Sequence, residues 1–352
     1  MQRKLLLLIC KCACNCVCTI ACTIAILAST LMTGCTANNK KTSVTGYKLN
    51  TIIQIDAYSN TDADILNGAL DLCDTYEKMF SRTMTDSLLY QVNSHQITEI
   101  PQELAQLIQY GIKYSELSMG AFDLTIGSIS QLWDFTASKP EVPAASAIAN
   151  ALQYVDYTRI NLTQNKSSKA ASNQDNTWSI SIPEGTIIDL GAIAKGYIAD
   201  RIKEYLVENG VKKAIINLGG NVLCIGRKTN TSNFSIGIKK PFSENGESLA
   251  VLSLDDKSAV SSGTYERYFY SGEDFYHHIL NPYTGYPYNN GLTSVTIISD
   301  NSITGDCLST TCFTLGLQEG LKLIESTDGV EAVFVTEDKN LHYSSGAKAY
   351  IQ

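Results

Sequence analysis

The sequence predicts an α+β fold built from antiparallel β-sheets and packed helices, and two observations carry this prediction. In the first part of the chain apolar residues recur at steps of three and four, the period of an amphipathic helix. From about residue 214 onward, short runs alternate apolar and polar residues, as half-buried strands do. The chain has 352 residues, 44% of them hydrophobic, so it is long enough to bury a sizeable core.

Two helices and a loop are predicted in the first part of the chain. Apolar residues at helical spacing follow Thr61 and Asp62 and continue to Phe80. A second helix opens at Pro101 and ends before Gly120, because proline is favoured in the first turn of a helix. Large apolar residues are almost absent from 161–176, which predicts an exposed loop.

The later elements are mostly strands. A helix over 191–209, closed by Gly210, follows two strands and precedes another, and a second helix interrupts the strand-rich part. No internal repeat divides the chain. The predicted strands are 178–182, 187–190, 214–218, 234–238, 249–254, 276–280, 292–298 and 332–335, and the interrupting helix is 304–317.

Acidic residues outnumber basic ones, which limits the classes of partner. The chain has 27 Lys+Arg against 35 Asp+Glu and a formal net charge of -8. A nucleic-acid-binding protein needs a basic surface to neutralise phosphates, so no nucleic acid is expected as a partner.

Residues 1–34 are typical of a bacterial lipoprotein signal peptide. Arg3 and Lys4 precede a long apolar stretch, and small residues lead to Cys35, whose thiol would take the lipid. The apolar stretch is also long enough to span a bilayer, so a retained transmembrane anchor is the alternative. The signal peptide and the retained anchor both predict an extracytoplasmic protein. With the signal peptide, the protein would be lipid-anchored to the cell membrane.

Small polar residues over 35–46 predict a flexible tether, so order is expected to begin near Tyr47 and the folded domain to span 47–352. Its four cysteines are expected to be free thiols. They are Cys73, Cys224, Cys307 and Cys312.

A strand, a glycine and a helix start meet at residues 189–197. Asp189 lies in the predicted strand 187–190, and the helix after Gly191 would present free amide groups to an anion, with Lys195 one turn further in. This is a phosphate-binding geometry, although it matches neither the P-loop nor the dinucleotide-binding glycine pattern. An ordinary strand-turn-helix with a surface lysine explains the spacing equally well. The paired glycines Gly219 and Gly220 form either a turn that admits a ligand or an ordinary turn.

Two further groups of residues could carry chemistry. His277 and His278 are adjacent in a predicted strand, so they should face opposite sides, and only one can enter a given site. Asp306 and Thr310 are four residues apart on a predicted helix, so both fall on one face. Carboxylate and hydroxyl oxygens suit Mg²⁺, but capping of the helix by Asp306 is the simpler explanation.

Five ordered motifs, taken together with the lipoprotein-like start, resemble the ApbE family of FAD:protein FMN transferases. The resemblance runs from about Tyr47 to the late strands. The motifs are GAFDLTIGSIS at 120–130, DLGAIAKG at 189–196, SSGTYERYF at 261–269, HHILNPYTGYP at 277–287 and DCLSTTCFTLG at 306–316.

The resemblance implies a T-fold-like, two-part α+β body with FAD in a cleft between the parts. It implies transfer of FMN from FAD to a Thr or Ser of an acceptor protein, with Mg²⁺ and release of AMP. Asp306 and Thr310 look like the metal ligands, with the backbone carbonyl of Ala192, and Asp306 and His278 are the candidate catalytic residues. The implied FAD contacts are Ala121, Phe122, Asp123, Asp189, Lys195, Thr264, His278 and Leu280.

Some residues depart from the family pattern. Asn281 stands where Asp is common, Leu124 stands where Pro is frequent, and Arg82 replaces part of a motif that usually carries an aromatic residue. The acceptors implied are membrane-associated redox subunits. Two alternatives use the same pocket: hydrolysis of FAD to FMN and AMP, and FAD binding without chemistry.

Overall fold

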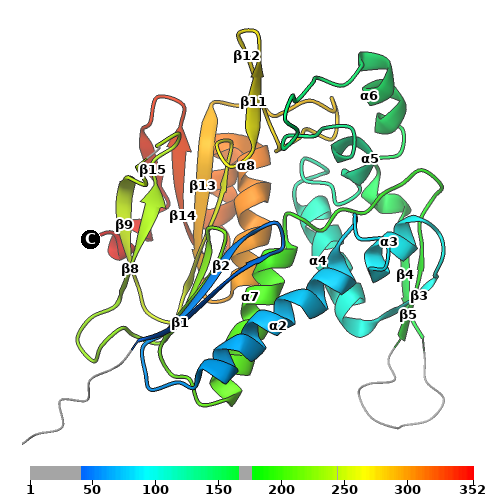
Figure 1. Cartoon of the computed structure of the whole chain (residues 1–352). Helices are drawn as coiled ribbons and strands as arrows, with labels where there is room; N and C mark the ends of the chain where they lie inside the picture. Colours follow the sequence, from blue (N-terminus) through cyan, green and yellow to red (C-terminus); the bar gives the residue numbers. More distant parts are fainter. Residues whose placement is uncertain (1–40, 166–176, 244) are drawn as a thin grey trace, which may run out of the picture. The chain divides into compact units, whose positions relative to one another are not determined.

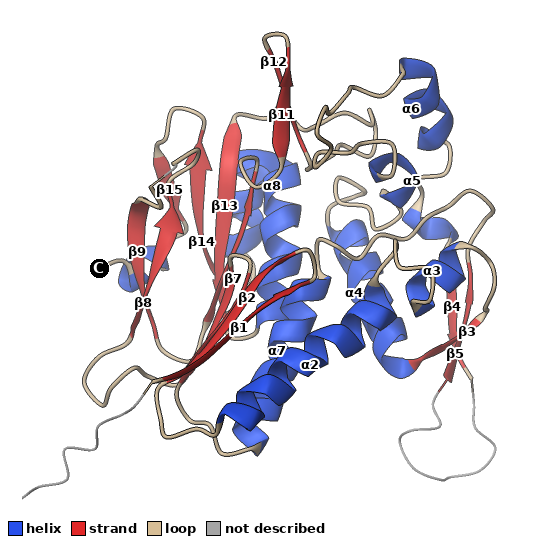
Figure 2. Ribbon diagram, viewed as in Figure 1, coloured by secondary structure: helices blue, strands red, loops and turns tan. Residues whose placement is uncertain are grey.

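An eight-stranded antiparallel sheet is the main element of this computed structural model, which describes residues 41–165, 177–243 and 245–352 (Figures 1 and 2). The strand order is β1-β2-β6-β7-β10-β13-β14-β15, and every neighbouring pair is antiparallel. The strands are β1 (Thr42–Lys48), β2 (Thr51–Ala57), β6 (Ala214–Leu218), β7 (Asn221–Ile225), β10 (Ser258–Gly263), β13 (Leu292–Ser299), β14 (Glu331–Thr336) and β15 (Leu341–Tyr343).

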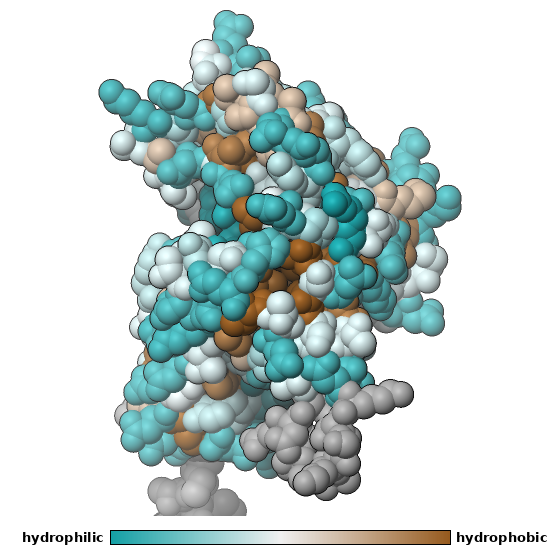
Figure 3. All heavy atoms as spheres, turned by 90° about the vertical axis from the view of Figure 1, so that its right-hand side faces the viewer, coloured by the Kyte–Doolittle hydropathy of each residue, from teal (hydrophilic) through white to brown (hydrophobic). Residues whose placement is uncertain are grey.

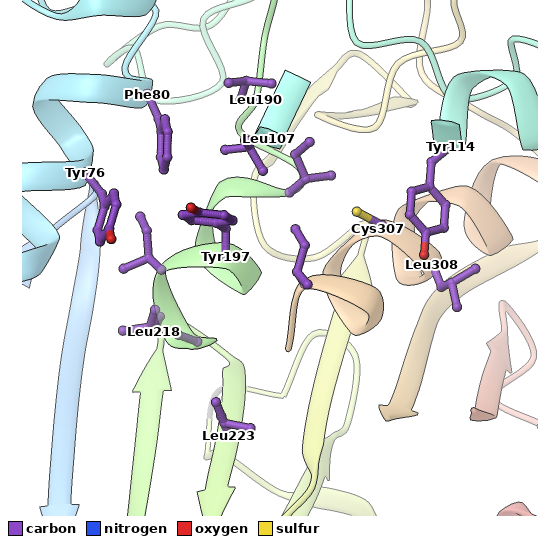
Figure 4. Close-up of a cluster of buried hydrophobic side chains, with 14 of the residues drawn as sticks. Tyr76, Phe80, Leu107, Tyr114, Leu190, Tyr197, Leu218, Leu223, Cys307 and Leu308 are labelled. Carbon is purple, nitrogen blue, oxygen red and sulfur yellow. The ribbon is translucent and has the colours of Figure 1, made fainter. Parts of the chain in front are cut away.

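Three helices cover one face of this sheet. They are α2 (Ala63–Phe80), α7 (Ala194–Glu208) and α8 (Ser302–Glu325), with α8 on β10 and β13 and α7 on β6 and β7. The layer between helices and sheet is apolar (Figure 4). In it the Tyr197 ring meets Tyr76 and Phe80 edge-on, at centroid distances of 5.7 and 5.5 Å. Such aromatic contacts fix the position of α7 against α2.

The other face is covered by the hairpin of β8 (Phe234–Lys239) and β9 (Ser248–Leu254), together with the 3-10 helix η3 (Ala347–Tyr350). Phe234 and Leu252 of this hairpin are buried beside Val333 of β14. Because both faces are covered, all eight residues of β13 are buried.

The remaining elements join the edge of the helical layer and include a small sheet of order β3-β5-β4 and a two-stranded sheet. The face in Figure 3 is mostly hydrophilic around a central hydrophobic area. The remaining elements, outside the large sheet and its covering layers, are α3 (Leu88–Asn93), β3 (Glu99–Pro101), α4 (Gln102–Leu117), α5 (Gly127–Ser130), α6 (Ala145–Leu152), η1 (Tyr157–Arg159), β4 (Asn161–Gln164), β5 (Thr177–Ser181), β11 (Tyr268–Ser271) and β12 (Asp274–His277).

The predicted α+β class is confirmed, and residues 41–352 form one compact unit. Cys35 and the predicted signal peptide lie outside the described residues. Among the residues that are described, no helix is long and apolar enough to cross a membrane. The four cysteines of the domain are buried free thiols, as predicted.

Some predicted boundaries are wrong. β1 begins at Thr42, so 42–46 belongs to a strand and not to the tether, because its backbone pairs with β2. Asn161–Gln164 is strand β4, paired with β5, whereas a loop was predicted there; the rest of that loop, 166–176, lies outside the described residues. α8 runs to Glu325, with a non-helical Gly316 where the predicted helix ended.

The predicted strand 187–190 does not form. Ile187 makes only one isolated bridge, to Ile126. The side chain of Asn93 takes the place of a neighbouring strand, because its amide bonds both the N–H and the C=O of Ile188, at 2.9 Å each. The chain therefore enters α7 as an irregular, side-chain-supported segment.

Candidate functional site

The N-terminus of α7 touches the second turn of α8. The Gly196 N–H donates to Oδ2 of Asp306 over 2.7 Å, and Asp306 is buried, with 4% of its surface exposed. A Cβ on Gly196 would lie 2.5 Å from the Ser302 carbonyl oxygen and 2.6 Å from the Asp306 Cβ. Glycine is therefore required for the two helices to approach this closely.

Asp306 does not cap α8, so the simpler explanation of that residue is wrong. The helix starts four residues earlier, where the Asn301 side chain accepts from the Thr304 N–H at 3.2 Å. Asp200 of α7 accepts the N–H groups of Ser302 and Ile303, at 2.8 and 2.9 Å. Since the start of α8 is already satisfied, Asp306 is not needed there, and its Oδ2 accepts the Gly196 N–H in the first turn of α7.

A second hard oxygen donor lies on the same face of α8 as Asp306. Thr310, one turn along α8, is half-buried, and its hydroxyl lies 3.0 Å from the Ser262 hydroxyl of β10. Ala192, whose carbonyl was the third predicted ligand, lies four residues before Gly196. The described residues hold no cluster of three His, Cys, Asp or Glu side chains. A cation here would be held by one carboxylate together with hydroxyl, carbonyl and water oxygens, a set that fits Mg²⁺.

Charges in this region act on one another. Burial raises the pKa of the Asp306 carboxyl, while the Lys195 ammonium and the Gly196 N–H lower it. Lys195 also acts on His278, so these three predicted residues belong to one neighbourhood. Burial lowers the pKa of His278, and the Arg267 charge lowers it further. The imidazole of His278 is therefore harder to protonate than an ordinary histidine, whose pKa is about 6.5.

Asp189 is held in place by a cation outside the five motifs, Arg82. Its Oδ2 accepts from the Arg82 Nε at 2.8 Å and from the Ser130 hydroxyl at 2.9 Å, and its Oδ1 accepts the Gly191 N–H at 2.9 Å. Arg82, noted only as a departure from the family pattern, is thus the ion-pair partner of a predicted FAD contact.

The loop containing Ala121, Phe122 and Asp123 is fixed by its own hydrogen bonds. Asp123 is buried; its Oδ1 accepts from the N–H and hydroxyl of Thr125, and its Oδ2 accepts from the Tyr157 N–H. The Tyr288 hydroxyl donates to the Ala121 carbonyl at 2.8 Å. These bonds join the loop to the segment after the histidines, and none of them joins it to Asp306.

The two histidines play different structural parts. His277 ends β12 and is 3% exposed; its Nε2–H donates to the Tyr288 carbonyl at 2.8 Å, and its Nδ1 accepts the Ile279 N–H. Burial lowers its pKa to about 4. His278 lies beyond the strand end, contrary to the predicted strand 276–280, because the Ile279 N–H bonds the His277 ring and not a neighbouring strand.

Thr264 and Leu280 are both buried, at 5% and 6% exposure. The Thr264 N–H donates to the Thr293 carbonyl, which continues the pairing of β10 with β13, and Leu280 packs in a separate apolar cluster with Trp133. Asn281 accepts the Tyr283 N–H on its side chain at 2.8 Å, as an aspartate could. The departure at this position therefore leaves the turn intact.

A groove of about 650 Å³ adjoins these residues. Thr264 and His277 line it together with aromatic side chains that include Phe275 and Tyr276 and with the acids Glu273, Asp274 and Glu337. Asp306 and Lys195 are not part of its lining, so this groove is not at the carboxylate site.

Comparison with known proteins identifies the family. The ApbE family profile matches residues 49–334. The chain is 34% identical over 314 residues to the FAD:protein FMN transferase of Klebsiella pneumoniae, covering 88% of this chain and 93% of that one. It is 30% identical over 313 residues to the enzyme of that name from Treponema pallidum, covering 85% of each chain.

Solved structures give the same result. The ApbE protein of Thermotoga maritima aligns with a TM-score of 0.77 at 29% identity, covering 89% of this chain and 100% of that one. The flavin transferase ApbE from Vibrio cholerae, 24% identical, shares the fold with a TM-score of 0.73, covering 88% of this chain and 99% of that one. The chain therefore belongs to the ApbE family.

Proposed function

We propose that this protein transfers FMN from FAD to a Thr or Ser hydroxyl of an acceptor protein and releases AMP, in a reaction that depends on Mg²⁺. One observation carries the proposal: the Gly196 N–H bond to Asp306, 2.7 Å long, joins the two motifs that must share one cation. The curated relatives that are named FAD:protein FMN transferase support the reaction.

Asp306, Thr310 and the carbonyl of Ala192 would hold the Mg²⁺. When bound, the ion would neutralise charge on the pyrophosphate of FAD. Thr310 is kept next to β10 by Ser262, and Asp306 is kept next to α7 by Gly196. These contacts fix both donors before any ligand arrives, which lowers the cost of ordering the site on binding.

The protein's own residues would bind and orient FAD. Lys195 supplies a positive charge next to Asp306 for a phosphate oxygen. Asp189, held by Arg82 and Ser130, and the loop of Ala121–Asp123 are proposed contacts for the rest of the dinucleotide, together with Thr264 and Leu280. Holding FAD and the acceptor hydroxyl in line would account for much of the rate, since phosphoryl transfer depends mainly on positioning and electrostatics.

Two residues could take the proton from the acceptor hydroxyl. Asp306 would supply a carboxylate near the reacting phosphate, and His278 would supply a neutral imidazole on which the Lys195 charge acts. Because its pKa is lowered, His278 is a weaker base than an ordinary histidine. We assign His278 to contact with FAD and leave proton removal to Asp306 or to both.

The test uses the soluble domain with FAD, Mg²⁺ and an acceptor that carries a flavinylation Thr. A fluorescent acceptor band that survives denaturing electrophoresis is expected, and its loss in Asp306→Ala would show that the carboxylate is needed. No band with an authentic acceptor and bound FAD would contradict the proposal. AMP release without acceptor at the rate of transfer would favour the pyrophosphatase, and FAD binding without turnover would favour a binding protein.

We also propose that Cys35 carries the lipid and holds the enzyme outside the cytoplasm at the cell membrane, next to membrane-associated redox subunits as acceptors. The lipoprotein-like sequence of 1–35 supports this. Cys35→Ser should abolish incorporation of labelled fatty acid and release the protein from the membrane fraction. Retention in membranes would instead favour an uncleaved transmembrane anchor.

A further inference from the structure

Asn221 is a buried amide that the proposed reaction does not yet use. It is the first residue of β7 and is 2% exposed. Its Oδ1 accepts the Ser302 hydroxyl at 2.6 Å, which fixes the orientation of the amide. Its Nδ2 is buried and has no acceptor at hydrogen-bond geometry. A buried donor without a partner is unfavourable, so a compensating interaction is expected nearby.

The nearest candidate anion is Asp306, because Ser302, which bonds the Asn221 amide, and Asp306 are four residues apart on one face of α8. The Asn221 side chain also lowers the pKa of the Asp306 carboxyl. Oδ2 of Asp306 is already held from α7 by the Gly196 N–H. The amide of Asn221 approaches from the sheet. The carboxylate therefore has one bonded donor, on α7, and a second donor without a partner on β7. Donors outside the ligand set typically orient metal-binding carboxylates.

The turn before β7 explains how Asn221 reaches this place. Gly219 and Gly220 have φ values of 63° and 95°, which glycine adopts at little cost, and they close β6 onto β7 within two residues. The Asn217 side chain accepts the Gly220 N–H at 2.9 Å. The paired glycines thus form a structural turn, and this turn places Asn221 beneath α8.

The N-terminus of α8 completes the arrangement. Asp200 accepts the N–H groups of Ser302 and Ile303, so the residue that bonds the Asn221 amide is itself held by α7. A continuous series of hydrogen bonds runs from α7 through Ser302 to β7.

We propose that Asn221 is a positioning residue: its amide, oriented by Ser302, holds the Asp306 carboxylate in the direction required to bind a divalent cation. This inference rests on the proposed function, because it assumes that Asp306 is a metal ligand. It adds a residue that the five motifs do not contain.

The experiment measures Mn²⁺ binding by electron paramagnetic resonance in the soluble domain without FAD or acceptor. Asn221→Leu removes the amide at similar volume and should weaken Mn²⁺ binding by about 10-fold to 100-fold. Ser302→Ala frees the Asn221 amide to rotate and should weaken Mn²⁺ binding less, by about 3-fold to 10-fold. Binding of FAD in the presence of a chelator should change less than about 3-fold in both variants.

The control is Thr296→Val, which also removes a buried hydroxyl. Thr296 is 1% exposed and pairs with Ser261 on the face of the sheet opposite to Ser262. The Thr296→Val variant should be less stable than wild type and should bind Mn²⁺ with unchanged affinity.

Mn²⁺ binding equal to wild type in Asn221→Leu would overturn the inference. Parallel losses of Mn²⁺ affinity, chelator-insensitive FAD binding and cooperative melting in Asn221→Leu would indicate a general loss of structure, and Ser302→Ala then decides. Wild-type Mn²⁺ affinity in Ser302→Ala would overturn the inference. Failure of the wild-type domain to bind Mn²⁺ would count against the metal dependence in the proposed function, and so the two failures are distinguishable.

Discussion

At the scale of single residues, the surroundings of a side chain determine its role more than the residue type does. Spacing alone did not distinguish the two adjacent histidines, but His277 is enclosed by backbone groups of Tyr288 and Ile279, and the charge of Lys195 acts on His278. The partners come from distant parts of the chain. No local pattern could have predicted them.

His277 should make stability depend on pH. Its pKa is about 4 in the folded protein against 6.5 for an ordinary histidine, so the unfolded chain binds more protons between these values. Stability from this group is present above pH 6.5 and is lost as pH falls towards 4, by about 3 kcal/mol at most.

Urea unfolding between pH 4.5 and 7.5 measures this dependence. His277→Gln should be less stable than wild type at pH 7.5 and should show a flatter decline towards acid. His342→Gln, at a half-exposed position of β15, serves as the control and should keep the wild-type slope. An unchanged slope in His277→Gln would contradict the assignment of a buried neutral imidazole.

Arg82 and Asp200 show what the motifs left out. Both act on predicted site elements through side chains more than 100 residues away in sequence, Arg82 on Asp189 and Asp200 on Ser302. A motif search finds residues at fixed local spacing, and these pairs have none. The Ser-Arg-Thr run at 81–83 was the one available signal, and it was interpreted as a departure.

At the scale of elements, the long periodic segments were predicted best. The helices α2, α4 and α7 and the strand β6 follow their apolar patterns, because burial of one face fixes both register and extent. The prediction of a strand over 187–190 was wrong, because an apolar run does not reveal that the Asn93 side chain bonds this segment in place of a neighbouring strand.

Gly196→Ala tests the contact between α7 and α8. The added methyl group would meet the backbone oxygen of Ser302 at 2.5 Å, so the helices must separate, at a cost of about 1–3 kcal/mol. The separation should also weaken Mn²⁺ binding, since the Gly196 N–H bond to Asp306 lengthens.

Thermal unfolding and Mn²⁺ titration measure both effects. Gly46→Ala is the matched control, because a Cβ there would meet nothing closer than 3.6 Å, at Leu70. Its stability and metal binding should equal those of wild type. A Gly196→Ala protein as stable as Gly46→Ala would show that the helices are not in close contact.

At the scale of the whole molecule, the sheet supplies the rigid support and the ends of its helices supply the chemistry. Asp306, Gly196 and Ser262 come from α8, α7 and β10, which pack on one another through the core of Figure 4. The resemblance to the ApbE family implied that Ala192, Asp306 and Thr310 share one cation, and the Gly196 to Asp306 bond shows that their two segments meet. The sequence could not predict the sheet order that brings Asn221 beneath them.

The measurement that tests the central claim most directly is anomalous diffraction from crystals soaked in Mn²⁺. One peak is expected between α8 and the start of α7, within about 2.2 Å of Asp306, Thr310 and the carbonyl of Ala192. The same soak of Asp306→Ala should show no peak there. A peak elsewhere in the wild-type protein, or one that remains in Asp306→Ala, would contradict the claim that these residues share one divalent cation.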